Sequence, residues 1–193
     1  MKLRNLMIGI AASSAMLMAG ASMAQSQPTT PAPAQGGAQT QGGAQQLDGN
    51  DEDFLENAAQ SGHAEIEGSK MAQQKASSPD VKAFAEKMIT DHTKVGDELK
   101  ALAQKKGYNP PTEPSLMQKA KLKTLSMTDD GFDEMYADQI GVSAHEDAVK
   151  LFEDASANAK DPDIKAFAAK NLPALQEHLT MAKELQQKVT ARK

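Results

Sequence analysis

Apolar residues recur every three or four positions between about residue 51 and residue 190, which is the spacing of one face of an α-helix. Two such faces each include a histidine, His92 in the first and His178 in the second. We therefore expect both imidazoles to point into a protein core. The first face is Val81, Phe84, Ala85, Met88, His92, Val95, Leu99 and Leu102, and the second is Ile164, Ala168, Asn171, Leu175, His178, Ala182, Leu185 and Val189.

A third helix, over 51–76, has a stripe of small residues instead of large apolar ones, which would allow another helix to approach closely. Glu65 lies within this stripe, so its carboxylate should be at least partly buried, and His63 lies on its flank. The stripe consists of Ala58, Gly62, Ser69, Ala72 and Ala76.

The apolar face of a fourth helix, over 128–159, drifts along the sequence from Tyr136 and Ile140 toward Phe152. Because of this drift the spacing does not decide between His145 and Asp147, and both stay candidates for the interior.

Start and stop residues bound the four helices. Ser78 and Asp161 can each cap a helix whose first residue is proline, and Gly107 follows a basic last turn. The connection over 108–127 contains three prolines and one short helix, and it is long enough to traverse a bundle. The sequence predicts an all-α fold, a ferritin-like four-helix bundle of two similar hairpins with a long crossover between the second and third helices.

An internal repeat supports the two hairpins. Residues 79–88, PDVKAFAEKM, return as PDIKAFAAKN at 162–171, and SGHAE at 61–65 has a looser echo in SAHED at 143–147. A doubled hairpin places equivalent residues around one axis, where helical bundles build metal and ligand sites.

The first 24 residues have the pattern of an export signal: Lys2 and Arg4, an apolar run, and the small residues Ser22 and Ala24 before a cleavage point. Residues 25–50, rich in Gln, Gly and Pro, are predicted to be a disordered linker before the bundle domain at 51–190. We expect a periplasmic or secreted protein of the bacterial cell envelope. The chain has no cysteine, which excludes disulfides and a lipoprotein anchor.

Charge limits the partners. Removal of the signal takes two positive charges and changes the formal net charge from -5 to -7, while basic and acidic residues alternate along the helical faces. This argues against nucleic acid as a partner. No second apolar run follows the signal, so no transmembrane segment is expected after its removal. An unknown protein or a small ligand remains the expected partner, with peripheral envelope association as the closest approach to a membrane.

The four histidines lie at similar heights in the predicted bundle. His63 and His92 are each about fourteen residues from the first hairpin turn, and His145 is similarly far from the second. At about 1.5 Å per residue these positions lie near the middle of the bundle, with His178 about one turn farther out. All four imidazoles can therefore occupy one central layer.

The segment from Phe54 to Leu185 resembles the bacterial family called domain of unknown function 4142, and the motifs Asp91-His92-Thr93 and Leu172-Pro173 to His178 carry the resemblance. It implies a ferritin-like bundle exported from the cytoplasm. Members are often labelled outer membrane proteins, which we interpret as envelope association, because this chain has no alternating barrel strands. The resemblance implies no established reaction.

A ferritin-like di-iron centre needs a glutamate three residues before each of two histidines, but Ile89 and Leu175 occupy those positions. The remaining candidates, Glu65, His92, His178 and either His145 or Asp147, suffice for a single divalent transition metal ion such as zinc or copper.

The hydrogen-bonding groups of inward histidines can also be satisfied by carboxylates. Asp91 adjoins His92 in the sequence, and Glu177 adjoins His178. No nucleophile motif or phosphate loop is present, so no catalytic residue is predicted. Two hypotheses follow: a non-enzymatic, stress-related envelope protein that binds a partner, which the sequence favours, and a metal-binding or redox protein of ferritin-like type.

Overall fold

The computed structural model describes residues 47–191, which form helices and no strand. The predicted signal peptide and most of the predicted linker lie outside the described residues. Within 47–191 no helix is long and apolar enough to cross a membrane. The elements are α1 (Gly49–Lys75), α2 (Pro79–Lys105), α3 (Leu116–Met127), α4 (Phe132–Tyr136), the π-helix η1 (Ala137–Ser143), α5 (Ala144–Asn158) and α6 (Pro162–Thr190).

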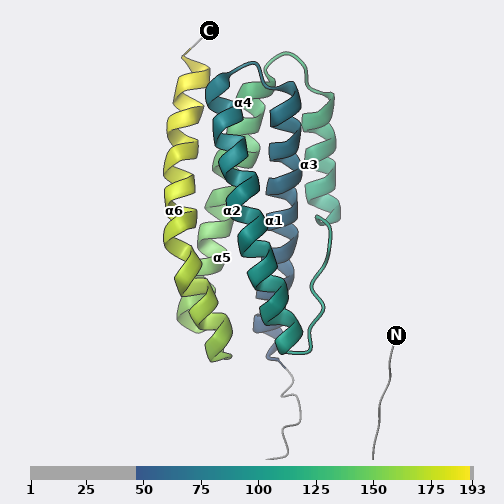
Figure 1. Ribbon diagram of the computed structural model, residues 1–193, viewed down its shortest axis with the longest axis vertical. Helices are drawn as coiled ribbons and strands as arrows, with labels where there is room; N and C mark the ends of the chain where they lie inside the picture. Colours follow the sequence, from purple (N-terminus) through teal and green to yellow (C-terminus); the bar gives the residue numbers. More distant parts are fainter. Residues whose placement is uncertain (1–46, 192–193) are drawn as a thin grey trace, which may run out of the picture. The chain divides into compact units, whose positions relative to one another are not determined.

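The long helices form a four-helix bundle with a crossover, as predicted. In Figure 1, α1 and α6 run in one direction, while α2 and the continuous α4–η1–α5 helix run in the other. The connection after α2 therefore returns along the whole bundle before α4 begins. Its helix, α3, packs on the outside of α1, where the Gln118 amide donates a 3.3 Å hydrogen bond to Ser61.

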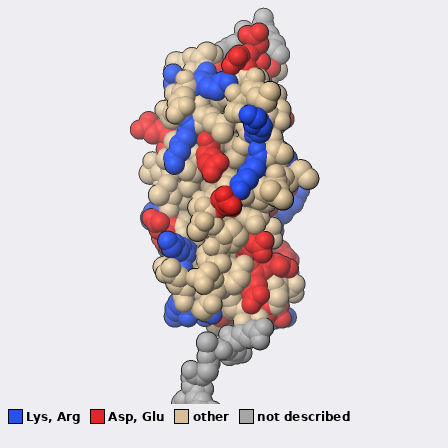
Figure 2. Space-filling view, turned by 90° about the vertical axis from the view of Figure 1, so that its right-hand side faces the viewer, with Lys and Arg blue, Asp and Glu red and all other residues tan. Residues whose placement is uncertain are grey.

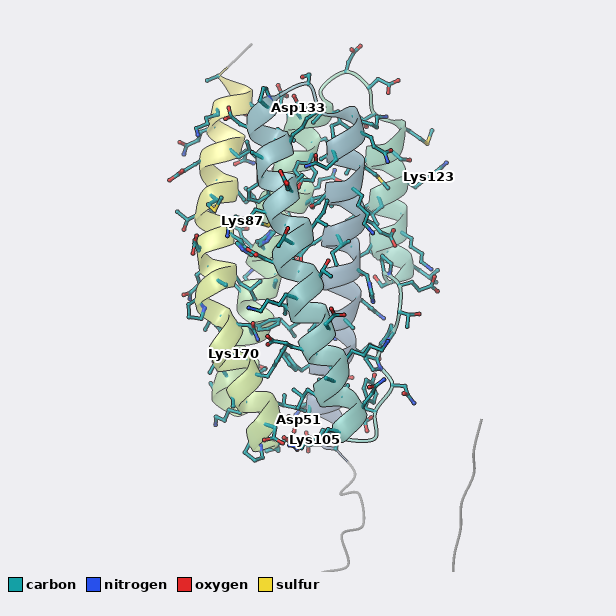
Figure 3. All side chains as sticks on the ribbon, in the orientation of Figure 1. Asp51, Lys87, Lys105, Lys123, Asp133 and Lys170 are labelled. Atoms are coloured by element: carbon teal, nitrogen blue, oxygen red, sulfur yellow. The ribbon has the colours of Figure 1, made fainter. Side chains whose placement is uncertain are left out.

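Two buried or half-buried aspartates join the hairpins at opposite ends of the bundle (Figure 3). Asp51, at the start of α1, accepts hydrogen bonds from the backbone N–H groups of Lys160 and Asp161, at 3.0 and 2.7 Å, in the α5–α6 turn. Asp133, at the start of α4, accepts from the backbone N–H groups of Ser77 and Ser78, at 3.1 and 2.8 Å, in the α1–α2 turn. Each hairpin thus supplies the polar partners for the other hairpin's turn.

The helix starts follow the sequence with three corrections. Asp161 caps α6 and Pro79 and Pro162 begin their helices, as predicted. However, α1 begins at Gly49 with Asp48 as its cap, two residues inside the predicted linker. The fourth predicted helix begins at Phe132 instead of residue 128, and the Ser78 side chain makes no capping hydrogen bond to α2.

The π-helix η1 was not predicted. It spaces the inward residues Ile140 and His145 five positions apart, whereas Tyr136 and Ile140 are four apart, and all three are buried. A π-turn accommodates one residue more than an α-turn. It therefore turns toward the core an apolar face that would otherwise rotate away from the core. This insertion is the physical reason for the drift in the sequence pattern.

Two apolar clusters fill the bundle, one toward each end. Along α2 the first cluster ends at Met88 and the second begins at Leu99, and His92 lies between them. Along α6 the second cluster ends at Leu175 and the first resumes at Ala182, with His178 between. The bundle therefore has a polar layer near its middle, between two apolar halves.

The outer surface carries interspersed charges. Figure 2 views the side on which α3 lies and shows lysines and acidic residues mixed over that face. Lys119 of α3, for example, pairs with Glu113 at 2.8 Å. Such mixed charge gives no continuous basic surface on this side.

Candidate metal centre

Three histidine rings from three different helices meet in the central layer. His92 comes from α2, His145 from α5 and His178 from α6, and their exposed fractions are 4%, 0% and 3%. Their ring centroids are 5.3, 5.4 and 5.5 Å apart. One nitrogen of each ring lies within 4.8 Å of a nitrogen of the other two, which makes the triangle compact enough to surround one metal ion.

His92 is oriented by Glu65. The Nδ1 of His92 lies 2.9 Å from Oε2 of Glu65, and the Glu65 carboxylate is 1% exposed. Because a carboxylate oxygen accepts, the Nδ1 of His92 carries the hydrogen, and the Nε2 atom turns toward the other two rings. Glu65 reaches this position from the stripe of small residues on α1, as the sequence predicted for its burial.

His145 is oriented by the backbone of η1. Its Nδ1 lies 2.8 Å from the carbonyl oxygen of Gly141 and 3.1 Å from that of Ile140, so Nδ1–H donates to these acceptors. Its Nε2 is then left 3.2 Å from Nε2 of His92. The π-helix thus both turns this ring inward and supplies the carbonyls that fix its tautomer.

His178 is oriented by Asp91 at the edge of the layer. Its Nε2 lies 2.9 Å from Oδ2 of Asp91, and the same oxygen pairs with Lys87 at 2.9 Å. Figure 3 shows Lys87 near the middle of the bundle's height. The other nitrogen of His178, Nδ1, is buried and has no hydrogen-bond partner among residues 47–191.

Each ring therefore has one nitrogen held by an acceptor. The second nitrogens of His92 and His145 face each other, and that of His178 has no partner among residues 47–191. Metal-binding histidines in proteins show this arrangement, because the outer hydrogen bond fixes the tautomer and strengthens the ligand. Two nitrogens each about 2.0–2.1 Å from a tetrahedral ion are about 3.3 Å apart. The 3.2 Å between Nε2 of His92 and Nε2 of His145 is close to that value.

The three imidazoles differ in their affinity for protons. Burial alone would lower the pKa of His92, but the adjacent Glu65 carboxylate outweighs it and raises that pKa. Burial lowers the pKa of His145, and burial together with the charge of His92 lowers the pKa of His178 to about 4. Without a metal, His92 is thus the ring that takes up a proton most readily, and a proton on its Nε2 would be donated to Nε2 of His145.

Burial would raise the pKa of Glu65, but the neighbouring imidazoles, His92 foremost, lower it. The Glu65 carboxylate is therefore ionised at neutral pH, and it is the negative charge that balances His92. A cation placed among the rings would take over the role of the His92 proton.

The structure separates the sequence-predicted residues into two groups. His92, His145 and His178 form the triangle, whereas Glu65 contacts the far side of the His92 ring and does not join it. Asp147 is exposed, because the π-turn brings His145 onto the inward face instead. His63 is half-buried and lies outside the triangle.

Two partners of the site had only weak signals in the sequence. The carbonyl groups of Ile140 and Gly141 are available to His145 because of the π-turn. The residue types in this segment do not predict a π-turn. The Lys87–Asp91 pair has the i,i+4 spacing of an ordinary surface ion pair, and its contact with His178 depends on the packing of α2 against α6.

The fold and site define an all-α bundle protein with a buried histidine triangle. The chain belongs to the family described as "Domain of unknown function (DUF4142)", whose profile matches residues 36–185, and this confirms the resemblance found in the sequence. The matched range begins inside the predicted linker. A comparison with curated proteins gave no match.

Solved structures share the fold at low identity. A DUF305 fragment from Deinococcus radiodurans has 11% identity and a TM-score of 0.65, over 75% of this chain and 99% of that one. CopM in the Cu(I)-bound form has 23% identity and a TM-score of 0.62, over 72% of this chain and 96% of that one. A conserved hypothetical protein from Mycobacterium tuberculosis has 19% identity and a TM-score of 0.58, over 72% and 91%.

Proposed function

We propose that this protein binds a single transition metal ion through His92, His145 and His178. Two observations support it: each imidazole is paired with its own acceptor, and one nitrogen from each ring lies within 4.8 Å of the other two. The sequence alone favoured a non-enzymatic binding protein without a named ligand. The geometry favours the metal-binding hypothesis instead.

A purely structural role explains this cluster less well. Histidines that serve only the core would use both nitrogens, yet Nδ1 of His178 is buried with no partner in the described chain. Leaving a buried polar atom unpaired destabilises a protein by about 1–3 kcal/mol. Replacing such a triad by apolar side chains would avoid that penalty, so a ligand that uses the nitrogen accounts for its retention better.

Copper is the first ion to test, and zinc the second. Neutral imidazoles suit both, and among divalent ions Cu²⁺ binds nitrogen sites most tightly. Structures of the same fold include CopM in Cu(I)-, Cu(II)- and Ag-bound forms, which favours copper. The absence of a bridging carboxylate among the three ligands argues against a di-iron site.

The pattern of residues 1–24 supports export, so we place the metal-binding domain in the periplasm or outside the cell. In that compartment the protein would hold or transfer the ion. This assignment is tested by sequencing the N-terminus of the protein isolated from the periplasmic fraction. Cleavage after Ala24 is expected, and an intact leader in the cytoplasm would contradict it.

The decisive experiment is metal titration of untagged, metal-stripped protein with Cu(I) and Zn²⁺, with bound metal quantified by mass spectrometry. We expect one ion per chain, and at least a hundredfold weaker binding in each of His92→Gln, His145→Gln and His178→Gln. His63→Gln is the matched control and should bind like the natural protein. Equal binding by all four variants, or no binding by the natural protein with its helical spectrum intact, would refute the proposal.

A further inference from the structure

A cavity of about 440 Å³ lies beside the histidine triangle, and of the three rings only His92 lines it. Its walls come from α1, α2, α5 and α6, and residues 109–112 of the crossover cover one side. Exposed residues such as Lys100 and Gln104 line its mouth, while Phe152 and Leu175 line its interior. The volume lies in the range of small-molecule sites, roughly 300–1,000 Å³.

One residue of the lining has a buried polar atom without a partner. Glu65 lines it, and although Oε2 of this carboxylate pairs with His92, Oε1 is buried and has no hydrogen-bond partner among residues 47–191. Nδ1 of His145 lies 4.0 Å from this oxygen, beyond hydrogen-bond distance, and that nitrogen already donates to Gly141. A buried carboxylate oxygen in this condition accepts a hydrogen bond from whatever donor enters.

Two glycines line the cavity. Gly62 of α1 and Gly96 of α2 both line it, and a Cβ atom added at either would meet nothing within 4 Å. In contrast, a Cβ at Gly68 would lie 2.9 Å from Ile140, so that glycine is required by helix packing. A glycine inside a helix destabilises it relative to alanine, and no close contact between helices requires Gly62 or Gly96.

We infer that this cavity binds a small apolar molecule with a terminal hydroxyl group, whose O–H donates to Oε1 of Glu65. The apolar walls would contact the apolar part of the molecule, and the buried oxygen would accept the hydrogen bond from its hydroxyl group. A neutral donor fits better than a cation, because Glu65 is already paired with His92 and a further buried positive charge would lie beside three imidazoles. The inference does not depend on a bound metal.

The test compares 4-butylphenol with butylbenzene by titration calorimetry on metal-free protein. A hydrogen bond to a charged group contributes about 1.5–3 kcal/mol, so the phenol should bind about ten to a hundred times more tightly. Equal affinities would overturn the role of Glu65, and no measurable binding of the phenol would overturn the site.

Variants locate the binding. Gly96→Leu should fill the cavity and abolish binding of 4-butylphenol without lowering the melting temperature, and Gly62→Leu provides a second filling variant. Ala83→Leu, on the exposed face of α2 outside the cavity, is the matched control and should bind normally. Unchanged binding in both filled variants would overturn the inference. His178→Gln, which lacks one proposed metal ligand, should still bind the phenol, so failure of the metal proposal is measured separately.

Discussion

At the scale of single residues, the three histidines have the same chemistry but different partners: a carboxylate, two backbone carbonyls and a carboxylate already paired with lysine. These partners set which nitrogen of each ring bears hydrogen. Burial makes the centre sensitive to acid, because it lowers the pKa of His145 and His178 and these two rings resist protonation in the folded protein. His178 is the ring for which this resistance is largest, with its pKa lowered to about 4.

We predict that the metal-free protein loses stability as the pH falls below about 6.5, where an unfolded histidine takes up its proton. Folded His178 stays neutral down to a pH of about 4, so between these values the unfolded state binds more protons and stability is lost as the pH falls. By pH 5 the loss from this residue would reach about 2 kcal/mol.

Urea unfolding of metal-free protein at pH 7, 6 and 5 measures this effect. These pH values lie above the ordinary pKa of carboxyl groups in an unfolded chain. His178→Gln should reduce the slope of stability against pH, and the buried His145, whose pKa is also lowered, should retain the rest. His63→Gln is the control and should keep the natural slope. An unchanged slope in His178→Gln would show that this imidazole is not shielded from protons.

At the scale of elements, the sequence predicted the long helices well because their apolar spacing, their capping residues and their proline starts all agree. It did not predict η1, because π-turns use the same residue types as α-turns. The drift of the apolar face between Tyr136 and Phe152 was the one available sign. Without the π-turn, periodicity could not decide between His145 and Asp147.

The π-turn also exchanges the burial of the repeated residues. His63 and Glu65 in the first hairpin correspond to His145 and Asp147 in the second, yet Glu65 and His145 are the buried pair. A repeat in sequence therefore did not give equivalent positions in space. One hairpin supplies the carboxylate and the other the imidazole from the same short motif.

Deletion of the exposed Ser143 tests the role of this turn. It should convert η1 to a regular α-helix, keep the histidine on the inward face and shift it along the helix by about 1.5 Å. Because a regular helix replaces the π-turn, we expect an unchanged or higher melting temperature. Because the ring would lose its fit to the Gly141 carbonyl, we expect the metal affinity to fall about ten- to a hundredfold.

Circular dichroism and metal titration of the deletion variant provide these measurements. Ser143→Ala keeps the chain length and should bind metal normally, which makes it the matched control. Full metal affinity after the deletion would mean that η1 does not position His145.

At the scale of the whole molecule, the number of helices and the crossover followed from the spacing of apolar residues and the length of the connection over 108–127. The histidine triangle did not follow from the sequence pattern, because it depends on how α2, α5 and α6 pack against each other. The cavity could not be predicted from the sequence either. Its walls come from four helices, and nothing in the order of residues shows that Gly62 and Gly96 line the same cavity.

The triangle spans both hairpins, since His92 belongs to the first and His145 and His178 belong to the second. Apolar contacts also join the hairpins, as do Asp51 and Asp133 at the two ends and ion pairs such as Lys106 with Asp161 and Lys170 with Glu98. A metal ion held in the middle would connect them at the level of the three buried imidazoles. Because the unfolded chain does not assemble the three ligands, binding energy becomes folding energy.

We therefore predict that metal raises the unfolding free energy by about 2.7 kcal/mol when its free concentration is a hundred times the dissociation constant. For a domain of this size the melting temperature should rise by roughly 5–10 °C in scanning calorimetry. His63→Gln should show the same rise, whereas His178→Gln should show almost none. An equal rise in His178→Gln would mean that the ion binds elsewhere on the surface, and the hairpins would then be held together without it.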